Sequence, residues 1–121
     1  MTVDEAYKMI KKARGNLVIL DVRNQSEYNL GHLYDAVLIP VYELEERISE
    51  LQDYINIPII VYCKAGSRSQ TACQILVNYG FTKVHNMPGG ITAWMEADYP
   101  VYTTYHYVTV DVVGKRTNRT N

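Results

Sequence analysis

Short apolar runs alternate with stretches of helical periodicity over the first hundred residues. The runs are rich in β-branched side chains, which predicts buried strands over 17–20, 36–39 and 59–62 and a further strand from Val84. Between them, apolar residues recur every three or four positions, as they do in amphipathic helices. Strands that alternate with helices predict an α/β fold, in which a mainly parallel central sheet has helices on both faces in a three-layer α/β/α arrangement.

Capping signals place the ends of the first two helices. Thr2 and Glu5 have the spacing of a capping box, and Gly15 closes the helix that follows them. Ser26 is expected to cap a short second helix over 27–30, which the next glycine stops.

The later helices are predicted from periodicity. Over 41–54, apolar residues at spacings of three and four lie among glutamates, which predicts an exposed amphipathic helix. Either Ser67 or Ser69 is expected to cap the helix after the third strand. A last short helix is expected over 91–97.

The pattern changes after Pro100. Residues 102–113 are rich in tyrosine and valine with loose alternation, and a polar tail follows. This composition predicts an added edge strand and a frayed tail, with a dimer contact or a partner surface as alternatives. The chain is therefore expected to contain one domain, residues 1–101, and a C-terminal extension, residues 102–121.

Composition narrows the class of function only a little. The chain has 121 residues, 47% of them hydrophobic and 21% charged, which is ordinary for a single soluble domain. A net charge of −1 gives no electrostatic reason to expect nucleic acid or an acidic membrane as a partner. The N-terminus lacks the pattern of a signal peptide, so a cytoplasmic, reducing location is expected, in which the two cysteines would not form a disulfide.

The strongest chemical signal is Cys63, which ends a buried run and precedes a short loop and a helix. A thiol at the carboxyl end of a strand, next to a helix N-terminus, lies where α/β folds bind anions. Lys64 and Arg68 bring positive charge that favours the nucleophilic thiolate. Gly66 would let successive backbone N–H groups converge on the sulfur. We therefore expect Cys63 to be a nucleophile rather than a packed core residue.

The hydroxyl groups of Ser67 and Ser69 add hydrogen-bond donors to the same loop. Cys73 has no comparable surroundings, so we assign it to packing, with a resolving-cysteine role as the alternative. No cysteine–histidine spacing resembles a zinc site, so no metal is expected.

Asp21 and Arg23 follow the first predicted strand and should lie at the same edge of the sheet as Cys63. One interpretation is structural: Asp21 caps a turn, and Arg23 pairs with a carboxylate such as Glu27. The other is that both residues orient the site from behind it. His32 is expected to be a hydrogen-bonded structural histidine.

A set of ordered motifs covers most of the chain, from Thr2 to Val101. They are Leu20-Asp21-Val22-Arg23, Glu27-Tyr28-Asn29-Leu30-Gly31-His32, Ile39-Pro40, Val61-Tyr62-Cys63 with its loop, Gly80-Phe81 with Val84, and Gly89-Gly90 with Trp94 and Pro100. In this order and spacing the chain resembles the rhodanese family of sulfurtransferases, specifically its single-domain members.

The resemblance implies a rhodanese-like fold for residues 1–101 and a role for each part of the loop. Cys63 would take the outer sulfur of a small anionic donor such as thiosulfate as a persulfide. A thiol or cyanide, or a protein thiol, would then accept that sulfur. The substrate-binding residues implied are Lys64, Ala65, Gly66, Ser67, Arg68 and Ser69, and the reaction needs neither a cofactor nor a metal.

Two alternatives and one departure accompany this resemblance. The chain could be a sulfur-relay or binding module for a protein partner, with slow turnover of free substrates. It could also be a cysteine-based phosphatase or arsenate reductase, but phosphatase loops have five residues between cysteine and arginine, whereas only four separate Cys63 from Arg68. Where family members commonly have Pro-Gly, this chain has Tyr34-Asp35, so Asp35 must adopt a turn conformation.

Overall fold

The computed structural model describes residues 1–104, and within them the strands form one parallel sheet. The strands are β1 (Val18–Asp21), β2 (Val37–Leu38), β3 (Ile59–Tyr62) and β4 (Val84–Asn86), in the spatial order β2-β1-β3-β4. All three pairings are parallel. The predicted α/β class and parallel sheet are therefore confirmed, with each boundary within a residue or two of the expected one.

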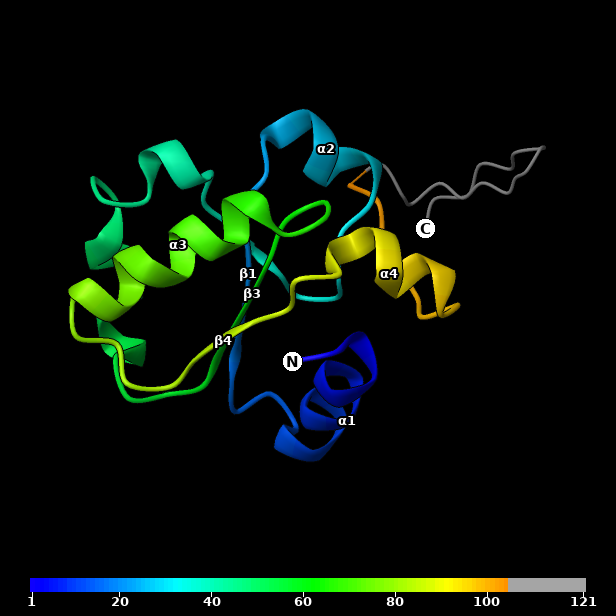
Figure 1. Ribbon diagram of the computed structural model, residues 1–121, viewed down its shortest axis with the longest axis horizontal. Helices are drawn as coiled ribbons and strands as arrows, with labels where there is room; N and C mark the ends of the chain where they lie inside the picture. The colour runs from blue at the N-terminus through cyan, green and yellow to red at the C-terminus, as the bar shows by residue number, and fades with distance from the viewer. Residues whose placement is uncertain (105–121) are drawn as a thin grey trace.

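The two faces of the sheet carry different helices because strand residues alternate in direction. One face, which includes Leu20, Val61 and Cys63, packs against α3 (Ser67–Asn78). The opposite face, which includes Ile60 and Tyr62, packs against α1 (Val3–Ala13) and α4 (Gly90–Glu96). Figure 1 shows α3 on one side of the strands and α1 and α4 on the other. This is the expected three-layer arrangement.

The helix starts agree with the predictions only in part. Thr2 and Glu5 form the capping box expected for α1. The second helix, α2 (Gln25–Leu30), begins instead with a capping box between Asn24 and Glu27, so the prediction of Ser26 as its cap is wrong. The Ser26 hydroxyl donates to the Asn24 side chain, which adds a contact to that cap.

The cap of α3 also differs from the prediction, because Gly66 and not a serine precedes the helix. Gly66 precedes the helix with a φ of 114°, and neither Ser67 nor Ser69 caps it. A left-handed backbone turn at Gly66 brings the chain into the helix without a side-chain acceptor. The two serines therefore lie in the first turn, and Ser69 is fully buried.

Residues 41–54 do not form the predicted amphipathic helix. They form two 3₁₀ segments, η1 (Val41–Glu43) and η2 (Ile48–Tyr54), joined by turns. A spacing of three and four suits both kinds of helix, so Leu44 and Leu51 are buried as expected. Arg47 pairs with Glu43 and Glu50 across the two segments, so the charged face is also retained.

The turn at Asp35 is left-handed as predicted, with a φ of 63°. The extension begins with Tyr102, which forms an isolated antiparallel bridge with His32. The rest of the predicted edge strand and the polar tail, residues 105–121, lie outside the described residues. No helix within residues 1–104 is long and apolar enough to cross a membrane.

Candidate active site

Cys63 follows β3 directly and lies on the face of the sheet that α3 covers. Asp21 lies opposite Tyr62 in the pairing of β1 with β3. The two chain segments after these strands therefore leave the sheet side by side, as the sequence predicted. Only 1% of Cys63 is exposed, so its thiol lies within the loop and not on an open surface.

The Cys63 sulfur is held by the loop that follows it. The Gly66 N–H donates to Sγ at 3.0 Å. The thiol donates to Ser69 Oγ at 3.6 Å, and the Ser69 hydroxyl in turn donates to the Gly66 carbonyl at 3.1 Å. Burial by itself raises the pKa of Cys63. Hydrogen bonds from the Ser69 hydroxyl and from the N–H groups of Ser69, Gly66 and Ala65 outweigh burial, and they lower the pKa below its ordinary value. The local geometry thus favours the thiolate form of Cys63.

The turn between β4 and α4 holds this loop in place. The N–H groups of Ile91 and Thr92, in the first turn of α4, donate to the carbonyl oxygens of Cys63 and Lys64 at 3.0 and 3.2 Å. Gly90 has a φ of 63°, and a Cβ there would lie 2.6 Å from the Cys63 oxygen and against the Lys64 carbonyl. The sequence predicts a turn at this position but assigns it no contact with the Cys63 loop. The adjacent glycines were the signal of a close backbone approach.

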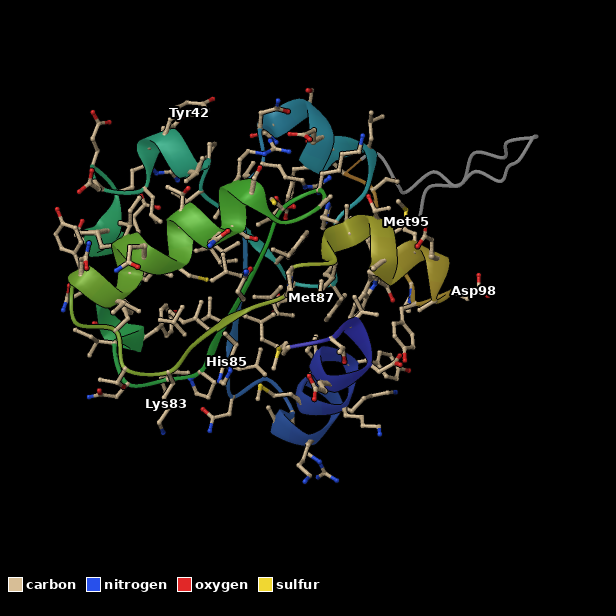
Figure 2. All side chains as sticks on the ribbon, in the orientation of Figure 1. Tyr42, Lys83, His85, Met87, Met95 and Asp98 are labelled. Atoms are coloured by element: carbon tan, nitrogen blue, oxygen red, sulfur yellow. The ribbon has the colours of Figure 1, made fainter. Side chains whose placement is uncertain are left out.

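A similar close approach occurs at Gly66, where a Cβ would lie 2.7 Å from the Pro88 oxygen. The loop and the turn therefore pack backbone against backbone. Met87, in the same turn, is fully buried between the sheet and α4 (Figure 2).

Asp21 and Arg23 form a buried ion pair behind the loop. Arg23 Nη2 lies 2.6 Å from Asp21 Oδ2, and the same nitrogen donates to the Gly31 carbonyl. The Tyr62 hydroxyl donates to Asp21 at 2.7 Å and accepts from the Leu33 N–H. The structural interpretation therefore holds in that Arg23 pairs with a carboxylate and Asp21 accepts the Arg23 backbone N–H at 3.0 Å, but the carboxylate is Asp21 and not Glu27. The sequence predicts for Tyr62 only a place in a strand, and nothing in its local sequence shows that its hydroxyl joins this network.

Glu27, in α2, pairs instead with Arg68, in the first turn of α3. Arg68 Nη1 and Nη2 lie 2.7 and 3.0 Å from the two carboxylate oxygens of Glu27. The hydrogen bond from Arg68 is the main cause that lowers the pKa of Glu27 to about 2. Arg68, which the sequence predicts to attract an anionic substrate, is therefore already paired with the carboxylate of Glu27.

Lys64 lies exposed at the edge of a small cavity that is also lined by residues of α2 and α4. The cavity has a volume of about 220 Å³ and is lined by Arg23, Glu27, Leu30, Gly31, Lys64, Ile91, Thr92 and Met95. Two apolar side chains at its rim are unusually open: Leu30 is 77% exposed and Met95, which projects from α4 (Figure 2), is 49% exposed. The cavity thus combines an apolar rim with charged groups from three segments.

The remaining candidates lie outside this arrangement. Cys73 is half-buried and packs against the core on the α3 side, where burial raises its pKa to about 11. His32 Nδ1 lies 2.8 Å from the Tyr28 carbonyl oxygen and its ring stacks on Tyr28, so the imidazole has the hydrogen bond expected of a structural histidine. Ala65 and Ser67 are exposed on the loop.

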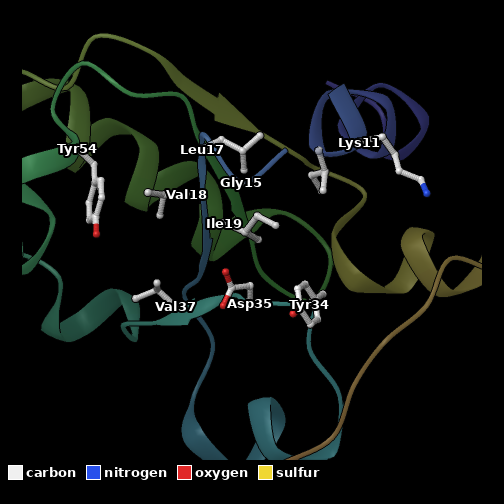
Figure 3. Close-up of a pocket in the computed structure, with 10 residues that line it drawn as sticks. Lys11, Gly15, Leu17, Val18, Ile19, Tyr34, Asp35, Val37 and Tyr54 are labelled. Carbon is white, nitrogen blue, oxygen red and sulfur yellow. The ribbon is translucent and has the colours of Figure 1, made fainter. Parts of the chain in front are cut away.

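A second cavity, of about 530 Å³, has no residue of the Cys63 loop in its wall. Figure 3 shows it between α1, β1 and the chain around Asp35, with Lys11, Tyr34 and Tyr54 among its lining residues. Among residues 1–104, no three metal-binding side chains gather at one point.

Comparisons of the sequence and of the structure with known proteins point to the same protein family. A family model described as the rhodanese-like domain matches residues 2–97. The thiosulfate sulfurtransferase GlpE of Coxiella burnetii is 38% identical over 90 residues, which are 74% of this chain and 80% of that protein. A sulfurtransferase of Allochromatium vinosum is 31% identical over 86 residues, 71% of this chain and 78% of that one. The crystal structure of a rhodanese-related protein from Thermoplasma volcanium superposes with a TM-score of 0.75 at 30% identity, over 84% of this chain and 95% of the other.

Proposed function

Because the chain belongs to the rhodanese-like domain family, we propose that it is a sulfurtransferase that carries sulfur as a persulfide on Cys63. The observation that carries the proposal is the Cys63 thiol, held by an N–H donor at 3.0 Å and by a buried serine hydroxyl, with its pKa lowered by these hydrogen bonds. A thiolate in such a cradle is a nucleophile that needs no metal to activate it.

The first half-reaction would use a small anionic donor such as thiosulfate. The Cys63 thiolate attacks the outer sulfur, a new S–S bond forms to Cys63, and the old S–S bond breaks with its electron pair leaving on sulfite. In the second half-reaction an acceptor thiolate or cyanide attacks that outer sulfur. The Cys63 thiolate is then released, and the acceptor leaves as a persulfide or as thiocyanate.

The loop supplies what these two steps need. The N–H groups of Ala65, Gly66 and Ser69, together with the Ser69 hydroxyl, stabilise negative charge on the sulfur. Lys64 attracts the donor, Arg68 binds it only in competition with Glu27, and Ser67 offers a further hydroxyl at the loop surface. Asp21 and Arg23 are positioning residues, since their hydrogen bonds hold the Tyr62 side chain, next to Cys63 in the chain, and the Gly31 carbonyl.

The loop length favours sulfur over phosphate. Only four residues separate Cys63 from Arg68, and a shorter ring suits one added sulfur atom better than a tetrahedral phosphate. Phosphatase and arsenate reductase activities are therefore the weaker candidates.

Mass spectrometry of the intact protein after thiosulfate treatment tests the proposal. The wild type and Cys73→Ser should gain one sulfur atom, which dithiothreitol removes, and Cys63→Ser should gain none. Thiosulfate turnover by Cys63→Ser would overturn the assignment of the nucleophile. The Cys73→Ser protein serves as the matched control, because Cys73 is half-buried and its pKa is about 11.

A second candidate is a relay module that passes the persulfide to a protein thiol. The observation in its favour is the apolar rim beside Lys64, where Leu30 and Met95 are open to solvent. Leu30→Ser/Met95→Ser should leave persulfide formation from thiosulfate unchanged in either case. The relay role predicts that this variant transfers sulfur to a protein thiol more slowly than the wild type does, whereas its transfer to cyanide keeps the wild-type rate.

A further inference from the structure

The cations around the Cys63 loop are not equally free to bind a substrate. Arg23 is held by Asp21 in a buried pair, and Arg68 is held by Glu27 through two hydrogen bonds. Within residues 1–104, Lys64 is the cation of this loop region that has no carboxylate partner. The sequence places three positive side chains near the thiol, those of Arg23, Lys64 and Arg68, but in the structure only Lys64 among them has no carboxylate partner within residues 1–104.

Glu27 is well suited to hold Arg68 because it is itself fixed. It is the third residue of α2, and its Oε1 also accepts the Asn24 N–H at 3.0 Å. Its side chain is 26% exposed, so its pair with Arg68 is partly shielded from solvent. With a pKa of about 2, Glu27 stays charged throughout the neutral range and keeps its hold on Arg68 at every pH at which the thiolate forms.

Arg68 and Cys63 also influence each other electrostatically. Besides the hydrogen bond to Glu27, which is the largest cause, the charge of Cys63 raises the pKa of Arg68. When Cys63 is a thiolate, the charges of Arg68, Glu27, Lys64 and Cys63 cancel. A dianionic donor therefore enters a neutral site, and it must compete with Glu27 for the N–H groups of Arg68.

We propose that Glu27 sets the charge preference of the site, by occupying Arg68 and so selecting sulfur donors of low charge over small dianions. This inference rests on the proposed sulfur transfer at Cys63. Glu27 acts through Arg68 and does not touch the sulfur, so it is a selectivity residue and not a catalytic one. The donors it favours are persulfides of small thiols or singly charged anions, and thiosulfate is disfavoured though still accepted.

Glu27→Gln tests this with little risk to the fold, because glutamine also serves in a capping box and can still accept the Asn24 N–H. The first measurement needs no sulfur chemistry: the rates at which iodoacetate, an anion, and iodoacetamide, its neutral counterpart, alkylate Cys63 in a Cys73→Ser background. Removing one charge should raise the iodoacetate-to-iodoacetamide rate ratio about three- to fivefold at low salt, as expected for a partly exposed charge.

Glu50→Gln is the matched control. Glu50 makes the same kind of two-bond pair with Arg47, on a 3₁₀ segment that contributes no residue to the cavity beside Lys64. Its removal should leave the ratio unchanged. The double variant Glu27→Gln/Arg68→Gln should return the ratio to the wild-type value, since it restores the neutral balance. A double variant that keeps the raised ratio would show that the effect does not pass through Arg68, and would overturn the proposal.

Kinetics with sulfur donors completes the test. For thiosulfate, Glu27→Gln should lower KM about threefold with little change in kcat, and a lesser effect is expected with a singly charged donor. An unchanged alkylation ratio in Glu27→Gln refutes the role of Glu27 even if every variant turns over thiosulfate. A raised ratio in proteins that never form a persulfide supports the charge role and refutes the proposed sulfur transfer.

Discussion

The buried pair of Asp21 and Arg23 gives the sharpest test of how the site is supported. Asp21 is fully buried, and its carboxylate accepts hydrogen bonds from the Arg23 side chain and from the Tyr62 hydroxyl. Asp21→Asn would leave the Arg23 guanidinium, only 5% exposed, without a counter-charge. Breaking a buried pair in this way costs about 3–5 kcal/mol, a large share of the 5–15 kcal/mol by which small domains are stable.

Urea unfolding followed by far-UV circular dichroism measures this cost. Glu43→Gln is the control: it breaks a comparable pair with Arg47 that is more than a third exposed, and it should change the free energy of unfolding little. The double variant Asp21→Asn/Arg23→Met removes the stranded charge as well, and should recover at least about 1 kcal/mol of the loss. A cost below about 1 kcal/mol for Asp21→Asn, or no recovery in the double variant, would refute the argument from burial.

Two further substitutions test the loop itself. Gly90→Ala should destabilise the fold by at least about 2 kcal/mol and slow the alkylation of Cys63, because its Cβ would clash with the carbonyls of Cys63 and Lys64. Gly15→Ala is also at positive φ but has open space around it, so it should cost only about 1 kcal/mol in the same urea unfolding experiment. Ser69→Ala removes the hydroxyl whose hydrogen bond with Cys63 lowers the pKa of the thiol, so that pKa should rise. The pH profile of its alkylation should then move to higher pH and the rate at neutral pH should fall, while the exposed Ser49→Ala leaves the profile in place; an unmoved profile in Ser69→Ala would contradict the assigned hydrogen bond.

The sequence was sufficient for Cys63 and for the sheet because both depend on contiguous residues. An apolar run that ends in a cysteine, followed by glycine and cations, marks a strand end whatever the rest of the chain does. The parallel order then brings the ends of β1 and β3 to the same edge. Asp35 could also be predicted, since a residue in place of the usual glycine must take over its backbone conformation.

Ion pairs and contacts for which the chain offers several partners could not be predicted from contiguous residues. Arg23 had two carboxylates within reach along the chain, and only the fold shows that Asp21 takes it and leaves Glu27 to Arg68. The adjacent glycines Gly89-Gly90 indicate that some backbone approaches closely, but they do not show that it is the Cys63 loop, which lies 27 residues earlier in the chain. Residues 41–54 have a periodicity that fits an α-helix and a 3₁₀ helix equally well, and propensity did not separate the two.

The alternation of side chains along β3 limits how this protein can change in evolution or by design. Val61 and Cys63 face α3, whereas Tyr62, between them, faces α1 and α4 and reaches Asp21. Inserting or deleting one residue in β3 would exchange the two faces, turning the thiol away from its donors and the hydroxyl away from its carboxylate. Changes in chain length should therefore be tolerated in the connections at the opposite edge of the sheet, such as the turn at Gly15, while the length of β3 stays fixed.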